Sequence, residues 1–247
     1  MKKIIYINLV FILFFNGQLL SQTFGFGCLG LSGFFAGYSQ QQFDGQHLNS
    51  SLNLISSGNP LLNMNEQPVK FQKVSGYRIG ANFFRADFES VFITAKGYYQ
   101  FLKEKHSVAD NTTLSQPRDD YELNLNHWGL GVDFGVPFFW IFDLKLVEAN
   151  VVFYNADLSR ETYNNYELQS EIRLSNSTNK VGYFIGSGLI MHLVRDYISL
   201  EGTAGFNFVE FENFSDGTVI LPLDSSKKAI QKNGFSATLQ LNIGFPL

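Results

Sequence analysis

The 247-residue sequence has little of several features that other protein classes need. Its single cysteine excludes a disulfide-stapled fold and a cysteine-rich zinc module. Charged residues make up only 16% of the chain, against about 25% in ordinary soluble domains. The net charge of −4 argues against nucleic-acid binding, because nucleic-acid proteins normally have a basic face. Beyond the first residues no stretch of about 18 apolar residues occurs, so no transmembrane helix is predicted there.

Residues 1–22 are predicted to be a secretory signal peptide. Lys2 and Lys3 form a positive start, and a short apolar segment runs from Ile4 to Phe15. A membrane-spanning helix would need about 20 apolar residues, which this segment does not reach. Cys28 lacks the upstream leucine of a lipoprotein signal, so lipidation is not expected. Cleavage near residue 22 would leave 23–247 as one exported domain.

Alternation of apolar and polar residues predicts unusually long β-strands. The clearest is the last, 234–247, where the alternation continues through the whole segment. Similar patterns predict strands at 23–39, 74–86, 90–103, 121–138, 143–158, 180–194 and 197–212. A membrane-spanning strand needs about 9–11 residues, whereas strands in globular proteins average about 5–6. The glycine-rich segment 23–39 does not show which of its faces is apolar.

The connections between these strands alternate between long and short. Long connections are expected at 40–72, 104–120, 159–179 and 213–232, and short ones at 87–89, 139–142 and 195–196. Short periplasmic turns and long extracellular loops are typical of outer-membrane barrels. The fold class predicted is therefore all-β, an eight-stranded antiparallel up-and-down transmembrane β-barrel. It would be integral to the outer membrane, with both termini in the periplasm. A soluble lipocalin-like barrel remains the alternative, because the alternation allows either face to point inward.

Aromatic residues support the membrane interpretation, since tyrosine and tryptophan favour the headgroup zones. They form two groups, Tyr77, Tyr99 and Trp128 toward the loop ends of the strands, and Phe138, Trp140 and Phe245 at the turn ends. In a soluble protein the aromatic run 138–142 would be an aggregation hazard. We therefore expect these two belts to contact outer-membrane lipid.

The signal peptide, the eight strands and the final segment Leu241–Leu247 together resemble the small outer-membrane β-barrel family of Gram-negative bacteria, the OmpA/OmpX type often labelled porin-like. The resemblance covers the whole chain after the signal peptide. It implies that the C-terminal strand is recognised by the barrel-assembly machinery. In the family this strand ends in an aromatic residue, whereas here Phe245 is followed by Pro246 and Leu247. A barrel architecture specifies a fold far more than a function.

If the apolar faces meet lipid, the opposite faces line the lumen, which in an eight-stranded barrel is just wide enough for side chains. The central charged residues of those faces are Arg78, Lys96, Asp133, Glu148 and Glu201, and Lys145 falls at the lower edge. Charges removed from water must pair. We predict that they form a network that plugs the lumen. The alternative is a narrow or gated path for small solutes.

No catalytic, metal or cofactor site is predicted. The four histidines, His47, His106, His127 and His192, show no paired spacing such as HExxH. Serines follow His47 and His106, but proximity in sequence does not make a nucleophile and its base. We expect a non-enzymatic protein whose loops serve binding, adhesion or envelope integrity, with a protein or glycan as partner. A lipid-modifying enzyme is the third hypothesis.

Two of the long connections have patterns of their own. Leu48, Leu52 and Ile55 have helical spacing and predict a short surface helix. Residues 166–174 alternate between apolar and polar side chains like a strand. A ninth spanning strand would break the even count, so we predict a β extension above the membrane, with an edge open to partners.

Overall fold

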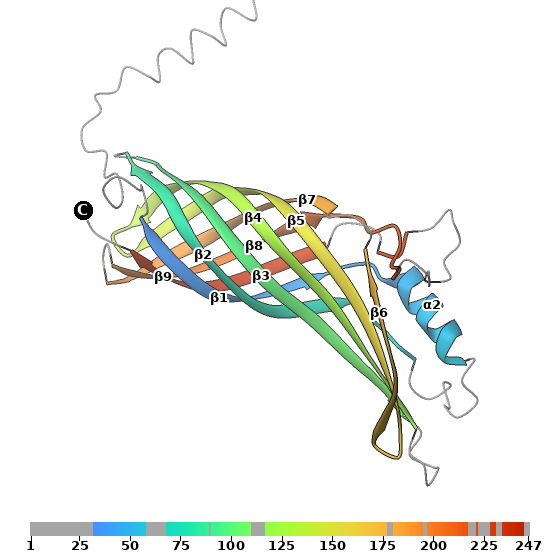
Figure 1. Cartoon of the computed structure of the whole chain (residues 1–247). Coiled ribbons are helices and arrows are strands. Elements are labelled where there is room, and N and C mark those ends of the chain that lie inside the picture. The colour runs from blue at the N-terminus through green and yellow to red at the C-terminus, as the bar shows by residue number, and fades with distance from the viewer. Residues whose placement is uncertain are drawn as a thin grey trace, which may run out of the picture.

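The computed structural model describes residues 32–57, 68–88, 90–109, 117–176, 180–194, 197–216, 221, 228–230 and 234–244 (Figure 1). Eight strands form a closed ring: β1 (Gly33–Gln42), β2 (Lys73–Asp87), β3 (Phe92–Ala109), β4 (Arg118–Phe139), β5 (Phe142–Asn164), β7 (Lys180–Val194), β8 (Ile198–Phe208) and β9 (Gly234–Gly244). Each pairs antiparallel with its neighbours, and β1 closes the ring against β9. The predicted eight-stranded up-and-down barrel is confirmed. The predicted signal peptide lies outside the described residues.

The strands alternate as the sequence predicts, with apolar residues outside and polar residues inside. In β1, whose faces the sequence leaves undecided, Phe34 and Tyr38 are exposed while Ser39 and Gln41 are buried. Side chains on a strand point alternately to its two faces, so one face of each strand lines the lumen. Over much of its length the barrel is thus the reverse of a soluble protein, with buried polar residues in the interior.

Helix α2 (Gln46–Ser57) forms where the sequence predicts a short helix. The Asp44 carboxylate accepts a hydrogen bond from the Gln46 backbone N–H (3.1 Å), which satisfies one of the free donors at the helix start. Leu48 and Leu52, one turn apart, are buried. None of the helical segments described has the length and apolar character needed to cross a membrane.

Two asparagines fix the segment 68–72 against α2. Asn49 donates to the Phe71 carbonyl (2.9 Å) and accepts from the Phe71 N–H (2.7 Å). Asn53 does the same with Val69, at 3.2 and 2.8 Å. The two asparagines are one helical turn apart, and their partners Val69 and Phe71 are two positions apart along an extended backbone. The helix thereby replaces a neighbouring strand as the hydrogen-bond partner of this segment.

Three strands extend beyond the predicted boundaries. The expected loops at 104–120 and 159–179 are largely strand, because β3 continues to Ala109, β4 begins at Arg118 and β5 ends at Asn164. β6 (Glu167–Ser175) pairs with the last part of β5 through a tight turn in which Asn165 and Tyr166 have positive φ angles. The predicted β extension therefore exists, and it is a four-stranded arm of β3, β4, β5 and β6 (Figure 1).

An apolar core fills the barrel at the end where α2 lies. It joins the helix to the strands and to the segment after β8, and its members include Leu48, Leu52, Phe71, Leu123, Leu125, Tyr154, Phe211 and Phe214. The sequence pattern does not predict this core, because it assigns 40–72 and 213–232 to loops. Its signal was the group of large apolar residues within segments that are otherwise polar.

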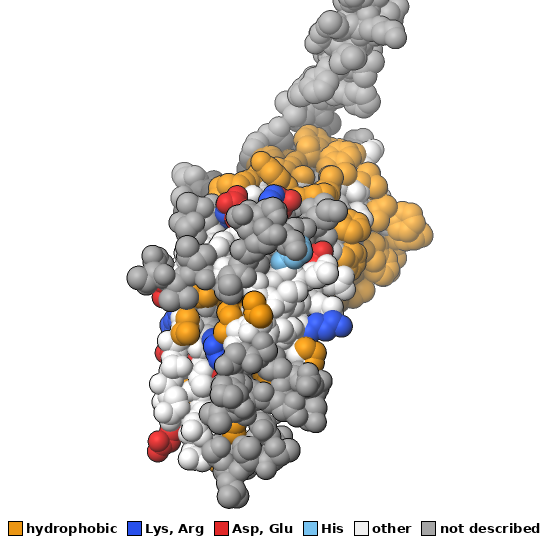
Figure 2. Space-filling model, turned by 90° about the vertical axis from the view of Figure 1, so that its right-hand side faces the viewer, with side chains coloured by type: hydrophobic (Ala, Val, Ile, Leu, Met, Phe, Trp, Pro, Cys, Tyr) orange, Lys and Arg blue, Asp and Glu red, His pale blue; other side chains and the backbone are white. Residues whose placement is uncertain are grey.

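The outer surface of the ring is apolar. Exposed side chains from all eight strands contribute, among them Tyr38, Ile79, Phe101, Leu130, Val151, Ile185, Phe206 and Leu239. In Figure 2 hydrophobic side chains gather over the upper right of the molecule and are sparser elsewhere among the coloured and white atoms. A contiguous exposed apolar surface of this kind marks a contact with lipid or another protein.

Candidate functional site: a charged layer inside the barrel

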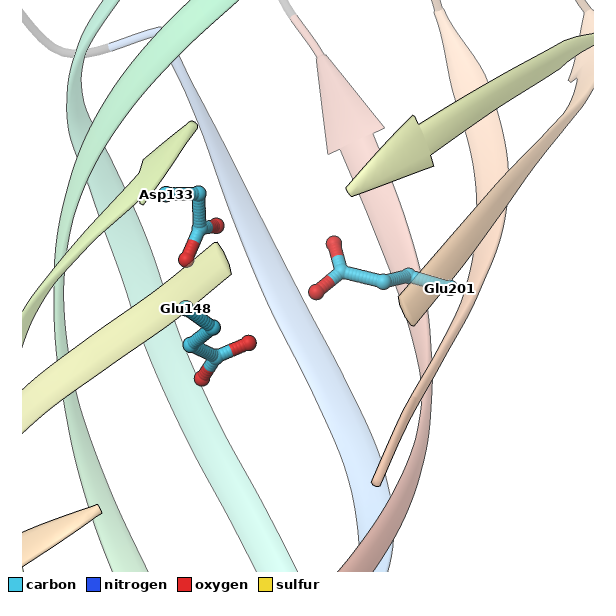
Figure 3. A group of neighbouring side chains, drawn as sticks. All are labelled: Asp133, Glu148 and Glu201. Carbon is cyan, nitrogen blue, oxygen red and sulfur yellow. The ribbon is translucent and has the colours of Figure 1, made fainter. Parts of the chain in front are cut away.

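Three carboxylates point toward one another inside the barrel (Figure 3). Asp133 and Glu148 lie opposite each other on β4 and β5, and Glu201 reaches in from β8. All three are buried, with side-chain oxygens within 4.8 Å of one another. Such a group could coordinate a cation only if nothing else balanced its charge.

Two lysine ammonium groups lie among these carboxylates. Lys96 Nζ is 2.8 Å from Glu148, 3.1 Å from Asp133 and 3.8 Å from Glu201. Lys145 Nζ is 2.7 Å from Glu148 and 3.3 Å from Asp133, and it also contacts Glu201. The lysines therefore supply the positive charge that a metal ion would otherwise bring.

Lys145 lies at the centre of the cluster, where its side chain is fully buried, and not at the lower edge as expected. The cause is a shift in register. Between Lys145 and Glu148 the ladder of β5 with β7 skips a pair, and Leu146 and Val147 are both exposed. This β-bulge turns two residues three positions apart to the same side. Simple alternation would have put them on opposite faces.

Arg78 completes the layer from β2. Its guanidinium lies 3.8 Å from Glu148 and 3.7 Å from the centre of the Tyr98 ring, in cation–π contact. Three carboxylates then face three cations, Arg78, Lys96 and Lys145, and the layer is neutral. The five residues singled out from the sequence sum to −1, and Lys145 supplies the missing charge.

Glycines on β4 make room for this layer. A Cβ at Gly129 would lie 2.1 Å from the Tyr98 ring, and one at Gly131 would lie 1.6 Å from the Asn150 side-chain oxygen. Asn150 donates to Glu148 at 2.9 Å. Side chains at these two positions would displace the groups that hold Arg78 and Glu148.

Further polar residues lie on both sides of the charged layer. Toward the turns between strands, Asp143 accepts from Arg85 (3.2 Å) and lies 2.9 Å from His192 Nε2. Toward α2, the Tyr154 hydroxyl lies 3.3 Å from the side-chain oxygens of both Gln41 and Asn207 and can donate its hydrogen to either. The apolar core follows beyond Tyr154. The interior is thus filled by successive layers of packed side chains.

The histidines have separate environments. His106 lies 3.1 Å from Glu104, His127 packs on Tyr154 and His192 contacts Asp143. His47 lies on α2.

The predicted belt aromatics lie on the outer surface wherever the structure describes them. Trp128 packs edge-on against Tyr99 with ring centres 4.7 Å apart, and Tyr77 is exposed nearby on β2. Phe138 and Trp140 are exposed at the β4–β5 turn, and Trp140 is 84% exposed. On β4, Trp128 lies near the middle of the strand and Phe138 at its end, so the two groups are separated along the outward face. Phe245 lies outside the described residues.

The four-stranded arm has its own ion pairs. Arg160 binds the buried Asp119 through Nε (3.0 Å), and Lys105 pairs with Glu122. Partial burial works to raise the pKa of Glu122, but hydrogen bonds from Lys105 and Asn124 outweigh it and hold that pKa below its usual value. The arm is therefore held by charged contacts as well as by its strand ladders.

No known family model matches the chain, and no curated protein matches its sequence. Solved structures with a similar fold include Ail, the attachment invasion locus protein of Yersinia pestis, at 8% identity and a TM-score of 0.41, covering 87% of this chain and 98% of that one. Ail in complex with the heparin analogue sucrose octasulfate gives a TM-score of 0.39 with the same identity and coverage. The outer membrane protease OmpT of Escherichia coli is 8% identical, with a TM-score of 0.38 over 87% of this chain and 94% of that one. Similarities this distant carry no argument about activity.

Proposed function

We propose that this protein is an integral outer-membrane β-barrel with both termini in the periplasm. The observation that carries the proposal is the inverted arrangement of the barrel, with charged side chains buried inside and apolar side chains exposed around the ring. The hydrocarbon core of a bilayer stabilises such a surface around the whole ring. The aromatic groups of Trp128 and Trp140 would lie at the two headgroup zones.

Its function lies outside the membrane, in our proposal, and is not enzymatic. The neutral charged layer and the apolar core together fill the interior, which favours a plugged lumen over an open path. Helix α2 and the four-stranded arm then provide the surface for adhesion, partner binding or envelope integrity. We also propose that β9 is the strand that the barrel-assembly machinery recognises.

The first test is heat-modifiability on a gel of the outer-membrane fraction. A closed barrel keeps its fold unboiled and changes mobility on boiling, and that shift is the expected result. A protein found in the soluble periplasm without a shift would overturn the proposal and favour a lipocalin-like carrier.

Conductance in planar bilayers tests the plug. We expect no steady channel from the wild-type protein. A steady conductance that changes on replacing Arg78 or Glu201 would contradict the plug and favour transport. Turnover of lipid that is lost when one loop histidine, His47 or His106, is replaced would instead favour the enzyme hypothesis.

A further inference from the structure

The outward face of the four-stranded arm is hollowed. A depression of about 530 Å³ lies across β3, β4, β5 and β6, and this volume is within the range of small-molecule sites. In the strand ladders Asn124 faces Asp157, and Asp157 faces Ser175. Asn124 is on the same side of β4 as the exposed Trp128, four positions away. The depression, called the arm hollow below, therefore opens sideways on the continuation of the outer barrel surface.

The outward face of β4 changes from apolar to polar beyond Trp128. Toward the turns it carries exposed apolar side chains such as Leu130. In the arm, which extends beyond the ring (Figure 1), the same face carries Asn124, Glu122 and Asp120. Four residues of strand cover about 13 Å, so the arm hollow begins clear of Trp128. A polar face in this position suits a ligand in water and not a lipid chain.

Hydrogen-bond donors and acceptors alternate across the arm hollow. One row of directly opposed residues crosses all four strands and consists of Lys105, Glu122, Ser159 and Arg173. Directly opposed side chains lie about 5 Å apart, so one small ligand reaches several of them. An aliphatic polyamine offers only donors to this row, and a sulfate or phosphate offers only acceptors. Sugar hydroxyls both donate and accept, and they satisfy every member of the row.

The charges that line the arm hollow do not cancel. Four carboxylates and two cations give a net charge of −2. Asp120 and Glu122 each have an ion-pair partner within the arm. Among the side chains that the structure describes, none forms an ion pair with Asp157 or Glu161. Glu161 accepts a hydrogen bond from the Tyr163 hydroxyl at 2.7 Å, which leaves its negative charge in place.

The Asp157 carboxylate is the less compensated of these two. Partial burial raises its pKa, and attraction to Arg173 offsets this only in part. Its directly opposed neighbours, Asn124 and Ser175, are both neutral. Asp157 and Glu161 lie four positions apart on one face of β5, about 13 Å along the strand. The unpaired negative charges are therefore at two separated points, with the row of alternating donors and acceptors between them.

We propose that the arm hollow binds an oligosaccharide of amino sugars, with one ammonium group at Asp157, a second at Glu161, and ring hydroxyls on the row between them. The inference rests on the proposed function, in which the arm is a binding surface beyond the membrane, and it names the ligand. Two ammonium groups balance the net charge of −2. The hydroxyls accept from Arg173 and donate to Ser159 or Glu122.

The ligand class is tested by isothermal titration calorimetry of the barrel protein in detergent micelles, at a mildly acidic pH that keeps the sugar amines protonated. The probe is the linear tetrasaccharide of glucosamine. Its N-acetylated form keeps the ring hydroxyls and lacks the ammonium groups, whereas spermidine has ammonium groups and lacks hydroxyls. We expect each comparison ligand to bind about tenfold or more weakly than the probe. No binding of the probe, or equal binding of either comparison ligand, would overturn the proposal.

Variants locate the site. Asp157→Asn and Glu161→Gln remove one charge each at constant shape, and each should weaken binding of the probe about fivefold or more. Ser159→Phe fills the centre of the arm hollow without changing its charge and should abolish binding. Glu167→Gln is the matched control, because Glu167 lies on the other face of the arm, opposite Asn164. Wild-type affinity in both charge variants, or an equal loss in the control, would place the ligand elsewhere and refute the site.

The same samples are run unboiled and boiled on a gel. A heat-modifiable protein that does not bind the probe would refute the saccharide site and leave the membrane barrel intact. A protein that binds the probe without heat-modifiability would refute the membrane barrel and leave the site intact. The failures of the two proposals are therefore distinguishable, and a variant that loses both properties is recognised as misfolded.

Discussion

Replacing Lys145 with methionine removes one charge from the centre of the barrel and little volume. Its ammonium lies 2.7 Å from Glu148, 3.3 Å from Asp133 and in contact with Glu201. At an effective dielectric constant of 20, attraction across 2.7 Å amounts to about 6 kcal/mol before the cost of desolvation. Loss of one partner from a buried ion pair typically costs about 3–5 kcal/mol. We expect Lys145→Met to lower the free energy of unfolding by that amount.

The reason is charge balance. Without Lys145, three carboxylates face two cations, and one negative charge is left uncompensated in a buried site. The double variant Lys145→Met/Glu201→Gln removes one charge of each sign and restores neutrality. We expect it to recover most of the lost stability, because replacing both members of a buried pair is often nearly neutral. The single variants and the double variant form a thermodynamic cycle.

The assay is urea unfolding of the barrel folded in lipid vesicles, followed by tryptophan fluorescence and by unboiled gel mobility. Lys103→Met is the matched control, since Lys103 is exposed on β3. It should change stability by less than about 0.5 kcal/mol. If Lys145→Met behaves like this control, or if the double variant is no more stable than Lys145→Met, the neutral network does not stabilise the barrel.

Three other predictions concern the segment beside α2, the aromatic belts and the four-stranded arm. Asn53→Ala should cost about 1–3 kcal/mol, because two backbone groups of the segment beside α2 lose their partner, and should speed proteolysis there, whereas the exposed Ser50→Ala should not. In the variant Trp140→Phe, lipids with a quencher near the headgroup should quench the remaining tryptophan more than lipids with a deep quencher; the reverse order would contradict the belt. The carboxyl of Glu122 should titrate below its ordinary 4.5 by NMR, and Lys105→Met should raise that pKa. Since the folded-state pKa is depressed, its stabilising contribution is present above about pH 4.5 and disappears as the pH falls through the lower value.

Much of the fold follows from local sequence. The alternation in 234–247 and the alternating connection lengths predict the strands, their even number and the up-and-down order, because a strand's faces repeat every two residues. Leu48 and Leu52 likewise predict α2 from helical spacing. The sequence does not predict the extension of β3, β4 and β5 into the expected loops, since these segments carry polar residues on both faces and lack the apolar–polar alternation that marks a strand.

The charged layer inside the barrel could be predicted only in part. The sequence assigns Glu148 and Glu201 to inward faces, since each lies in a regular stretch of alternation. It cannot place Lys145, because a bulge exists only where two strands pair out of step and leaves no signature within one strand. In the sequence, Gly129 only interrupts the alternation. The structure shows its role, because the ring of Tyr98 on the neighbouring strand occupies the space that a side chain at Gly129 would need.

What the sequence alone determined is therefore whatever depends on neighbours along the chain: strands, turns, a helix and the apolar outer face. The tertiary structure decided what depends on neighbours across the ring. It made the interior charges neutral through Lys145, joined distant segments into an apolar core above them, and left β6 at an edge of the arm. Pairing between strands sets these contacts, and no periodicity within one strand encodes them.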